Sequence, residues 1–373
     1  MRRVLFLNNQ GLGSIGGGVT ILRHLVADFA QDSAVTVMSF DEPAPAPPEV
    51  RQIALPRPPA AGTLWRAAPL LRARHLARTA PSEAIAEADL VIALDCHFAP
   101  LLARTPPRRL IYLSLSCIPR QEWFGNSGIQ AGLSFAQYAW LEYRIGYLAD
   151  DIVASSHMHA RELRRFAALW PRAPRVIYPV FEAGPALPAR RQDPPMILSL
   201  GRLEHVKRFD FVIAMAERLR RTQCRFVIAG AGQLEDALRA RARAVGVADR
   251  IEFAGPRMDV RPLLAEASLL LHPSCYESFG IAVFEAMCAG VPPVFLADAV
   301  AGFREITHDG VDACALDPSS LDAAATALGA LLADPARRAA MGEAAKSTAA
   351  RLLASSYTAE FRKLAGPGGR QPS

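Results

Sequence analysis

Two glutamates, Glu277 and Glu285, mark the part of this chain that is richest in potential chemistry. In residues 271–293, LHPSCYESFGIAVFEAMCAGVPP, an aliphatic run ends at His272 and helical apolar spacing begins at Gly280. Free N–H groups at a helix start favour a phosphorylated or polyhydroxylated ligand, and carboxylates form charge-assisted hydrogen bonds with sugar hydroxyls. The segment therefore predicts a sugar-nucleotide site.

Glutamates also occur near helix starts simply because of the helix dipole, so one of them alone would mean little. Here two of them bracket residues 279–280 and are followed by an alanine-rich helix and a Gly-Val-Pro stop at residues 290–292. This pattern resembles the E-x7-E signature of retaining glycosyltransferases of family 4, which have the two-domain GT-B fold. The resemblance identifies the chain as an enzyme, a hexosyltransferase that uses a nucleoside-diphosphate sugar.

Carried onto this sequence, the resemblance assigns the two ends of the donor. Glu277, with Ser278 and the backbone around Phe279 and Gly280, is expected to hold the transferred sugar. Further along, Glu285 is expected to hold the nucleotide ribose.

Two cations follow the first predicted strand of the second half, in the stretch GRLEHVK at residues 201–207. Ligands collect at the carboxyl ends of parallel strands, so Arg202 and Lys207 should point at the ligand. An arginine binds phosphate oxygens with two hydrogen bonds and a lysine adds a point charge. The stretch resembles the family's G-R-x4-K diphosphate site, and surface salt bridges are the plainer alternative.

A glycine-rich loop, residues 10–18, follows the first strand of the chain. Glycine lets the backbone approach a ligand closely, and the resemblance places Gly16 and Gly17 against donor phosphate and acceptor. The same loop contains G-x-G-x-x-G at residues 11–16, which would suit an NAD-dependent dehydrogenase. The acid expected about 20 residues downstream for the ribose is poorly placed, and that reading leaves Glu277 and Glu285 unexplained.

Other matches are looser. Gly230 begins a G-x-G after a strand, where family members often contact the nucleotide, and residues 302–310 resemble a G-x2-E-x4-G segment. Residues 112–123 and 154–180 resemble bacterial mannosyltransferases of the family, which favours mannose as the transferred sugar.

The family histidine that reaches the reacting sugar has no counterpart here, because Ser114 or Ser116 stands in its place. His97, beside Asp95 at a strand end, is the candidate replacement. A histidine at a strand end is more often structural, so an enzyme without this imidazole remains the alternative.

Both halves alternate short aliphatic runs with helical segments, which predicts parallel sheets covered on both faces. The fold class is therefore α/β, and the resemblance makes it two Rossmann-like domains facing across a cleft. Residues 1–185 form the acceptor-side domain and residues 186–373 the nucleotide-sugar domain, whose final helix could pack back on the first. Residues 182–195 are the proline-rich linker. Strands are expected at residues 4–8, 35–40, 90–94, 110–114, 152–155, 176–178, 196–200, 226–229, 251–253, 269–272 and 293–296. Helices are expected at residues 19–30, 133–149, 209–221, 234–245, 280–289 and 321–333.

Composition restricts the class of protein to which the chain can belong. A chain of 373 residues with 51% hydrophobic and 21% charged residues fits a globular enzyme with two cores. A net charge of +6 permits anionic partners, and no nucleic-acid motif accompanies it. Six scattered cysteines predict free thiols in a reducing compartment, and no run of about 20 apolar residues predicts a membrane span. We expect a cytoplasmic protein.

A proline- and alanine-rich stretch, residues 42–59, leads to a helix-like segment at residues 65–78 that carries four arginines beside Trp65. A solvated basic face is the favoured interpretation. Peripheral contact with the inner face of an anionic membrane is the alternative.

The expected partners are a nucleotide-sugar donor and a glycan or lipid-linked acceptor, in cell-surface polysaccharide biosynthesis. There is no D-x-D motif, and the two cations neutralise the diphosphate, so no metal and no other cofactor is expected. A protein that binds sugar nucleotides without transferring them remains the non-enzymatic alternative.

Overall fold

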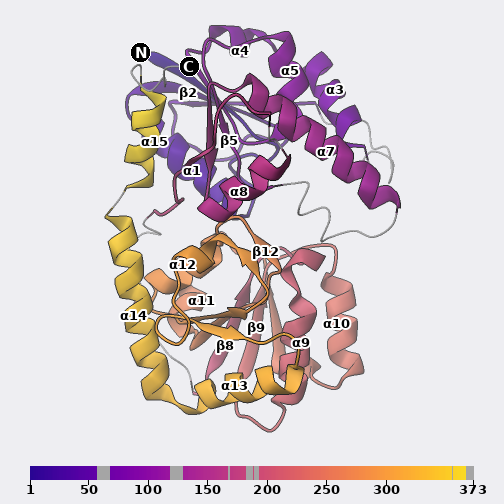
Figure 1. Ribbon diagram of the computed structural model, residues 1–373, viewed down its shortest axis with the longest axis vertical. Coiled ribbons are helices and arrows are strands. Elements are labelled where there is room, and N and C mark those ends of the chain that lie inside the picture. The colour runs from indigo at the N-terminus through magenta and orange to yellow at the C-terminus, as the bar shows by residue number, and fades with distance from the viewer. Residues whose placement is uncertain are drawn as a thin grey trace. The chain divides into compact units, whose positions relative to one another are not determined.

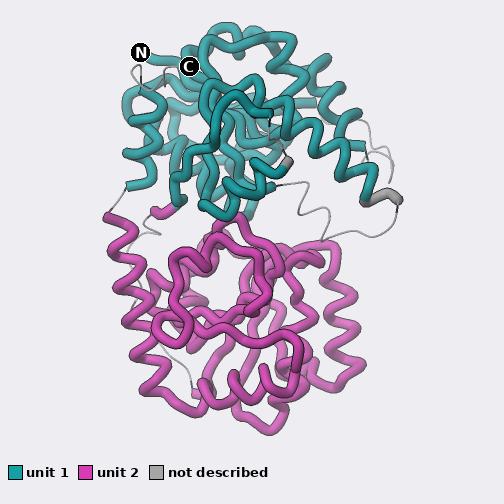
Figure 2. The backbone as a smooth tube through the Cα atoms, in the orientation of Figure 1, with its two compact units in different colours: residues 1–179, 356–373 teal, residues 180–355 magenta. Residues whose placement is uncertain are grey.

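The computed structural model describes residues 1–56, 68–117, 129–166, 169–181, 188, 193–354 and 356–366, with the backbone alone for residues 129–131 and 166. The chain forms two compact units: unit 1 is residues 1–179 with 356–373, and unit 2 is residues 180–355 (Figure 2). The sequence predicted a boundary at residues 185–186 and a final helix that could pack back on the first domain; the chain passes into unit 2 near residue 180 and returns to unit 1 at residue 356. Most of the predicted linker lies outside the described residues.

Unit 1 is built on a seven-stranded sheet whose order is β3-β2-β1-β4-β5-β6-β7 (Figure 1). Every strand pair in it is parallel. The strands are β1 (Arg2–Leu7), β2 (Ser33–Ser39), β3 (Val50–Ala54), β4 (Leu90–Ala93), β5 (Leu110–Leu113), β6 (Asp151–Ala154) and β7 (Arg175–Val176). Central strands such as β4 and β5 are buried along their whole length, as aliphatic runs without polar alternation predict.

Helices cover both faces of this sheet. One face carries α3 (Pro69–Thr79), α5 (Ala99–Arg104) and α7 (Ile129–Leu148), which share a core with Leu5, Val91 and Ile152. On the other face, Phe29 of α1 (Gly17–Phe29) packs edge-on against Phe6 and against Phe361 of α15 (Tyr357–Ala365). The short α4 (Glu83–Glu87), the 3₁₀ turn η1 (Cys96–Phe98) and α8 (His157–Phe166) complete the unit.

Unit 2 is built on a six-stranded parallel sheet with the order β10-β9-β8-β11-β13-β15. Its strands are β8 (Met196–Leu200), β9 (Arg225–Ala229), β10 (Ile251–Gly255), β11 (Leu269–His272), β13 (Pro293–Leu296) and β15 (Cys314–Leu316). A small parallel pair, β12 (Tyr276–Glu277) and β14 (Val300–Ala301), lies outside this sheet. The predicted α/β class with two parallel sheets is confirmed.

Two groups of helices cover the sheet of unit 2. One core joins it to α9 (Phe209–Arg218), α10 (Glu235–Ala244) and α13 (Leu321–Ala333). The remaining helices are α11 (Arg261–Glu266), α12 (Ile281–Cys288) and α14 (Pro335–Leu353), and α12 and α14 meet where Gly290 lies against Gly342. The 3₁₀ turns are η2 (His205–Lys207), η3 (Ala248–Arg250) and η4 (Gly302–Glu305).

Three predictions of secondary structure were wrong in part. No strand was predicted in the proline- and alanine-rich residues 42–59, yet they contain β3. This edge strand is free of proline and, among the described strands, pairs only with β2. The helix predicted at residues 209–221 ends at Arg218, and the strand predicted at residues 176–178 is only Arg175–Val176. The alanine-rich α14 was not predicted, because its buried face consists of small residues and one methionine that carry no aliphatic period.

In the part of the chain that the structure describes, no helix is both long and apolar enough to cross a membrane.

Candidate functional site

The strand order of each sheet defines where a ligand can bind. Chain order reverses between β1 and β4 in unit 1 and between β8 and β11 in unit 2. In open parallel sheets, ligands bind outside the carboxyl ends of the strands at such a switch point. In unit 2, residues 201–207 leave β8 and residues 273–277 leave β11, so the switch point brings the two predicted segments together.

Lys207 and Glu277 form an ion pair at this switch point. The Lys207 ammonium contacts Oε1 of Glu277, and Nε2 of His272 lies 2.8 Å from the same oxygen. The side chains of Lys207 and Glu277 are only 15% and 13% exposed, and that of His272 is 3% exposed. Pairing of β12 with β14 holds the backbone of Glu277 against Ala301. His272 was not predicted as a partner of Glu277, because this contact depends on where the chain after β11 turns back.

The charge state of Glu277 is set by these two neighbours. Burial by itself would raise the pKa of the Glu277 carboxyl, but the positive charge of Lys207 and the hydrogen bond with His272 outweigh it. The pKa therefore lies below its usual range, and Glu277 is an anion at every physiological pH. A carboxylate of this kind accepts hydrogen bonds from sugar hydroxyls.

Glu285 has the opposite environment. It lies on α12, and none of the described residues forms a hydrogen bond or ion pair with its carboxylate. Burial, reinforced by the negative charge of Asp259, raises the pKa of Glu285 to about 7. A half-buried carboxylate without a partner is ready to accept hydrogen bonds from a ligand's hydroxyls.

Arg202, the other predicted cation, is accessible. Its side chain is 51% exposed, and its Nη1 donates to Oε1 of Glu204 at 2.7 Å. An exposed ion pair of this kind is weak, so an arriving diphosphate can replace Glu204 at low cost.

Gly230 has a structural role that the sequence analysis did not foresee. Its φ is +150°, and a Cβ there would collide with the carbonyl oxygen of Gly201. The loop after β9 therefore packs directly on the loop that carries Arg202, which any side chain at residue 230 would prevent. A nucleotide contact by Gly230 stays a prediction.

The predicted residues 278–280 lie between β12 and α12. Phe279 is buried and packs on Phe284 with ring centroids 5.9 Å apart, so only its backbone can face a ligand. Gly280 begins α12 with a φ of +97°, and a Cβ there would lie against the ring of Phe303. Gly280, the residue before α12, has no side chain with which to cap the first N–H groups of the helix.

In unit 1, the glycine-rich loop is held by residues that the sequence analysis missed. Asp41, just after β2, accepts hydrogen bonds from the Gly11 N–H at 2.8 Å and from the Ser14 hydroxyl at 2.5 Å. Arg23 of α1 donates to the carbonyl of Leu12 at 2.8 Å. A ribose-binding acid of a dinucleotide site would need a free carboxylate, so this use of Asp41 counts against the dehydrogenase interpretation.

Gly16 and Gly17 lie at the start of α1. Gly16 has a φ of +150°, and a Cβ at this position would meet nothing within 4 Å. The space above the helix start is open, as a ligand site requires, and α1 has no side-chain cap. Contact of either glycine with a donor remains a prediction.

His97 lies at the switch point of unit 1. Its Nδ1 is 2.5 Å from Oδ1 of Asp95 and 3.3 Å from Nδ2 of Asn9, and its ring stands edge-on to Tyr138. The Nδ1 proton directed at Asp95 leaves Nε2 as the acceptor nitrogen. Nε2 is buried and has no hydrogen-bond partner among the described residues. The imidazole is oriented as a base would be, and its catalytic use remains a prediction.

Ser114, which stands in place of the family histidine, is hydrogen-bonded to another histidine. His159 Nε2 lies 3.2 Å from the Ser114 hydroxyl, while His159 Nδ1 accepts from the Ser155 N–H at 3.3 Å. That acceptor role puts the proton on Nε2, so His159 donates to Ser114 and cannot activate it. Burial lowers the pKa of His159 to about 3, which keeps the ring neutral.

Glu142 of α7 is a buried acid that the sequence analysis did not single out. It accepts a hydrogen bond from the Tyr112 hydroxyl, and its residue is 1% exposed. Burial, together with the charge of Asp95, raises the pKa of Glu142 to about 8. At neutral pH it is therefore largely a neutral carboxylic acid.

One trio, Asp95, Cys96 and His97, brings three potential metal-ligand atoms within 4.8 Å of one another. The donor set fits a metal poorly. Asp95 and His97 already satisfy each other, and burial raises the pKa of the Cys96 thiol well above its usual value, which disfavours the thiolate. All six cysteines are free, four of them buried.

Parts of the looser matches can be placed. Residues 118–128, including the tryptophan of the mannosyltransferase-like segment, lie outside the described residues. Residues 302–310 form η4 and the turn after it, where Phe303 packs edge-on against His272 at 5.7 Å. That segment thus packs against His272, which contacts Glu277.

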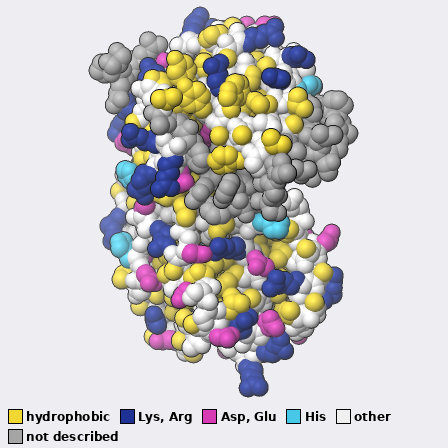
Figure 3. All heavy atoms as spheres, turned by 45° about the vertical axis from the view of Figure 1, so that its right-hand side comes forward, with side chains coloured by type: hydrophobic (Ala, Val, Ile, Leu, Met, Phe, Trp, Pro, Cys, Tyr) yellow, Lys and Arg dark blue, Asp and Glu magenta, His cyan; other side chains and the backbone are white. Residues whose placement is uncertain are grey.

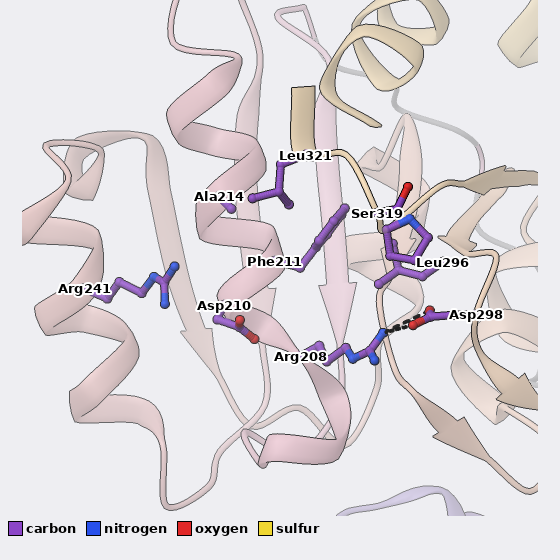
Figure 4. Close-up of a pocket in the computed structure, with 10 residues that line it drawn as sticks. Arg208, Asp210, Phe211, Ala214, Arg241, Leu296, Asp298, Ser319 and Leu321 are labelled. Atoms are coloured by element: carbon purple, nitrogen blue, oxygen red, sulfur yellow. Dashed lines mark hydrogen bonds and ion pairs between the residues drawn. The ribbon is translucent and has the colours of Figure 1, made fainter. Parts of the chain in front are cut away.

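A separate pocket of about 480 Å³ lies on unit 2 between α9, α10 and the start of α13 (Figure 4). Arg208 at its edge forms two hydrogen bonds with Asp298, at 2.9 and 3.0 Å. None of the predicted site residues lines it, so this pocket is not the site that the two glutamates define.

The fold is one that solved glycosyltransferases share. A sucrose-phosphate synthase from Thermosynechococcus elongatus superposes with a TM-score of 0.82 over 98% of both chains, at 18% identity. HepE from Anabaena, solved in complex with UDP and glucose, gives a TM-score of 0.76 over 98% of this chain and 99% of that one, at 20% identity. The chain therefore has the GT-B fold, as predicted.

Sequence comparison adds a match to one family over part of the chain. Residues 185–348 match the family described as "Glycosyl transferases group 1". D-inositol 3-phosphate glycosyltransferase from Kribbella flavida is 32% identical over 229 residues, which are 55% of this chain and 53% of that protein. The chain spans about half the length, or less, of the curated relatives it matches. The similarity to group 1 glycosyl transferases thus falls mainly on unit 2, which carries Glu277 and Glu285.

Proposed function

We propose that this chain is a retaining glycosyltransferase that moves a hexose from a nucleoside-diphosphate sugar to a glycan or lipid-linked acceptor. The observation that carries the proposal is the Lys207–Glu277 ion pair at the switch point of unit 2, together with Glu285 on α12. Its support comes from the family match over residues 185–348 and from relatives whose names specify glycosyl transfer. Mannose as the sugar, and cell-surface polysaccharide biosynthesis as the setting, rest on the looser resemblance of residues 112–180.

In the proposed donor site, the cations and the acids bind different parts of the sugar nucleotide. Arg202 and Lys207, with the uncapped start of α12, stabilise the diphosphate as negative charge develops on it. Glu277 accepts hydrogen bonds from the hexose, and Glu285 accepts them from the ribose. No metal is required for this charge balance.

Transfer in this proposal keeps the configuration of the sugar. The bond between the anomeric carbon and the diphosphate oxygen breaks, and the acceptor oxygen forms its bond on the same face. The acceptor's hydroxyl proton passes to the departing diphosphate. Because the acceptor oxygen attacks the anomeric carbon directly, no protein nucleophile is needed. His97 of unit 1 is the proposed replacement for the family histidine that reaches the reacting sugar, and its Nδ1 is hydrogen-bonded to Asp95.

The rival proposals differ in what they bind. A dehydrogenase would bind NAD(H), and the engagement of Asp41 with its own loop argues against that. A protein that only binds sugar nucleotides would keep the same donor site and show no turnover.

Ligand-induced thermal stabilisation tests the proposal. GDP-, UDP-, ADP- and dTDP-sugars and NAD(H) would each be added with and without EDTA, because a ligand of the native state raises stability by mass action. One sugar nucleotide should raise the melting temperature equally with and without EDTA. Lys207→Met should lower its affinity about 10- to 100-fold, because a charged hydrogen bond contributes about 1.5–3 kcal/mol.

Lys363→Met is the matched control, since Lys363 is exposed and pairs with Glu360 in the preceding turn. It should leave donor affinity unchanged. Stabilisation by NAD(H) alone would overturn the proposal, and donor binding without hydrolysis or transfer would leave only the binding protein.

A further inference from the structure

Helix α7 is apolar on two opposite faces, and the described residues of unit 1 bury only one of them. Tyr138, Leu141 and Ile145 are buried in the core of unit 1. On the outer face, Leu133 is 59% exposed, Trp140 46% and Tyr147 53%. A helix that is apolar all round is normally buried on all sides, so the outer face of α7 calls for something to cover it.

The three exposed side chains form one stripe, the α7 stripe, defined as Leu133, Trp140 and Tyr147. They are seven residues apart, which on an α-helix is a shift of only about 20° around the axis and a rise of about 10 Å per step. The stripe is therefore about 20 Å long and straight. Arg144 lies beside it, with its guanidinium 5.8 Å from the centre of the Trp140 ring.

The helices next to α7 contribute positive charge and no exposed acid. Leu70 N–H of α3 donates to the Gln137 side chain at 3.2 Å, and Arg72 of α3 donates to the Tyr138 hydroxyl at 2.6 Å. Across α3, α5 and α7 the basic side chains are Arg72, Arg74, Arg78, Arg104 and Arg144. Among the described side chains of these three helices the single acid is Glu142, which is buried. Figure 3, which brings this side of Figure 1 forward, shows hydrophobic side chains gathered on unit 1 with Lys and Arg around them.

We propose that the α7 stripe, with Arg74 and Arg78 of α3, docks unit 1 on the surface of an anionic lipid bilayer. Tryptophan, tyrosine and leucine beside arginine are the residues that settle at the boundary of headgroups and acyl chains. The charge pattern selects this occupant over a second copy of the chain. A symmetric dimer through this face would set arginines against arginines with no acid to pair them.

The inference revises the location of the membrane contact considered from the sequence. That contact was placed on residues 65–78, of which residues 65–67 lie outside the described residues. The apolar part of the surface is instead supplied by α7, and α3 supplies the cations. The inference goes beyond the proposed transferase activity, because docking requires neither donor nor acceptor.

Vesicle co-sedimentation of the full chain tests the proposal without any nucleotide. Vesicles of phosphatidylcholine would be compared with vesicles that also contain about 30% phosphatidylglycerol, whose surface attracts basic residues. The chain should bind the anionic vesicles, and binding should weaken as salt rises from about 0.1 M to about 0.5 M. In the chain carrying Trp140→Ser and Tyr147→Ser, the partition coefficient should fall at least tenfold.

Charge is tested separately. Each arginine near an anionic surface contributes about 1 kcal/mol, or about fivefold in binding, so Arg74→Ser with Arg78→Ser should weaken partition about 30-fold. Val311→Ser, at a residue that is 60% exposed on unit 2, and Arg243→Ser on α10 are the matched controls and should change nothing.

Three outcomes would overturn the proposal: no binding to anionic vesicles, equal loss in the control variants, or a dimer in solution that Trp140→Ser and Tyr147→Ser dissociate. Circular dichroism of each variant would separate loss of docking from loss of folding. Since no sugar nucleotide enters the assay, failure of the proposed transferase function would leave this result intact.

Discussion

Lys207 is one of three lysines in a chain whose Lys and Arg residues number 42. Apart from the other two lysines, all of these residues are arginines. An ammonium is a compact point charge, whereas a guanidinium is a planar fork that needs room for five donors. Lys207 is largely buried against Glu277, with His272 on the same oxygen, so the smaller cation fits where a guanidinium would displace one partner.

Glu285 should destabilise the unliganded protein at alkaline pH. Its folded pKa of about 7 lies above the ordinary value of 4.5, so its burial carries no penalty below about pH 4.5, and the penalty grows as pH rises from there to about 7 and is constant above. Glu285→Gln should therefore raise the free energy of unfolding at pH 8 by about 2–3 kcal/mol and leave it nearly unchanged at pH 4.5. Urea denaturation at both values measures this.

The same variant should bind the sugar nucleotide more weakly, so stability and affinity should move in opposite directions. Glu343→Gln, at an exposed glutamate of α14, is the control and should change neither. Equal stability of Glu285→Gln and the parent chain at pH 8 would show that Glu285 is better solvated than its environment indicates.

At the scale of elements, the donor site depends on how closely the loops after β8 and β9 pack. Gly230→Ala would force a methyl group into the carbonyl of Gly201 at a positive φ. We expect a loss of about 2–4 kcal/mol in the free energy of unfolding, and weaker donor binding because the loop that carries Arg202 must move. Denaturation and calorimetric titration with the donor would measure both.

The variant Gly246→Ala separates the effect of backbone strain at a positive φ from the effect of a steric collision. Gly246 also has a positive φ, +68°, but a Cβ there would meet nothing within 4 Å. This variant should lose only about 1–2 kcal/mol and keep full donor affinity. If both glycine variants behaved alike, the packing of the two loops would not matter for the site.

At the scale of the whole molecule, residues 356–366 return to unit 1, and Arg109 is one of the residues that hold them there. Arg109 donates to the carbonyl of Ala365 at 3.1 Å and to that of Leu364 at 2.5 Å, and pairs with Asp151 at 3.1 Å. A cation at a helix C-terminus satisfies carbonyls that have no partner within the helix. Phe361 completes the attachment by packing edge-on against Phe29.

Arg109→Leu should leave Asp151 and the end of α15 without their main partner, at a cost of about 3–5 kcal/mol in the free energy of unfolding. Hydrogen exchange should show loss of protection in α15, while the donor site in unit 2 keeps its affinity. Arg108→Leu, at a neighbouring exposed arginine paired with Asp89, should change stability by less than about 1 kcal/mol. Unchanged protection of α15 in Arg109→Leu would assign its attachment to the other contacts, the pairing of Arg362 with Asp28 and Asp32 and the packing of Phe361 on Phe29.

Much of unit 2 could be predicted from local sequence. The strands β8, β11 and β13 begin and end where the aliphatic runs predicted, since Gly, His-Pro and Pro interrupt these runs. Arg202, Lys207, Glu277 and Glu285 could be singled out because motif spacing in a strand–loop–helix unit is a local property. Edge strand β3 and the small pair β12–β14 could not, because their pairing energy comes from segments distant in sequence.

The amino-acid sequence by itself thus determined the α/β class and the parallel sheets, and it singled out the acids and cations of the proposed donor site, since each depends on residues close together in the chain. Only the tertiary structure decided that His272 and Lys207 share one oxygen of Glu277, that Glu285 has no partner among the described residues, that Asp41 holds the glycine-rich loop and that α15 belongs to unit 1. These facts depend on which strands become neighbours and how deeply each charge is buried. Neither quantity is carried by any single stretch of sequence.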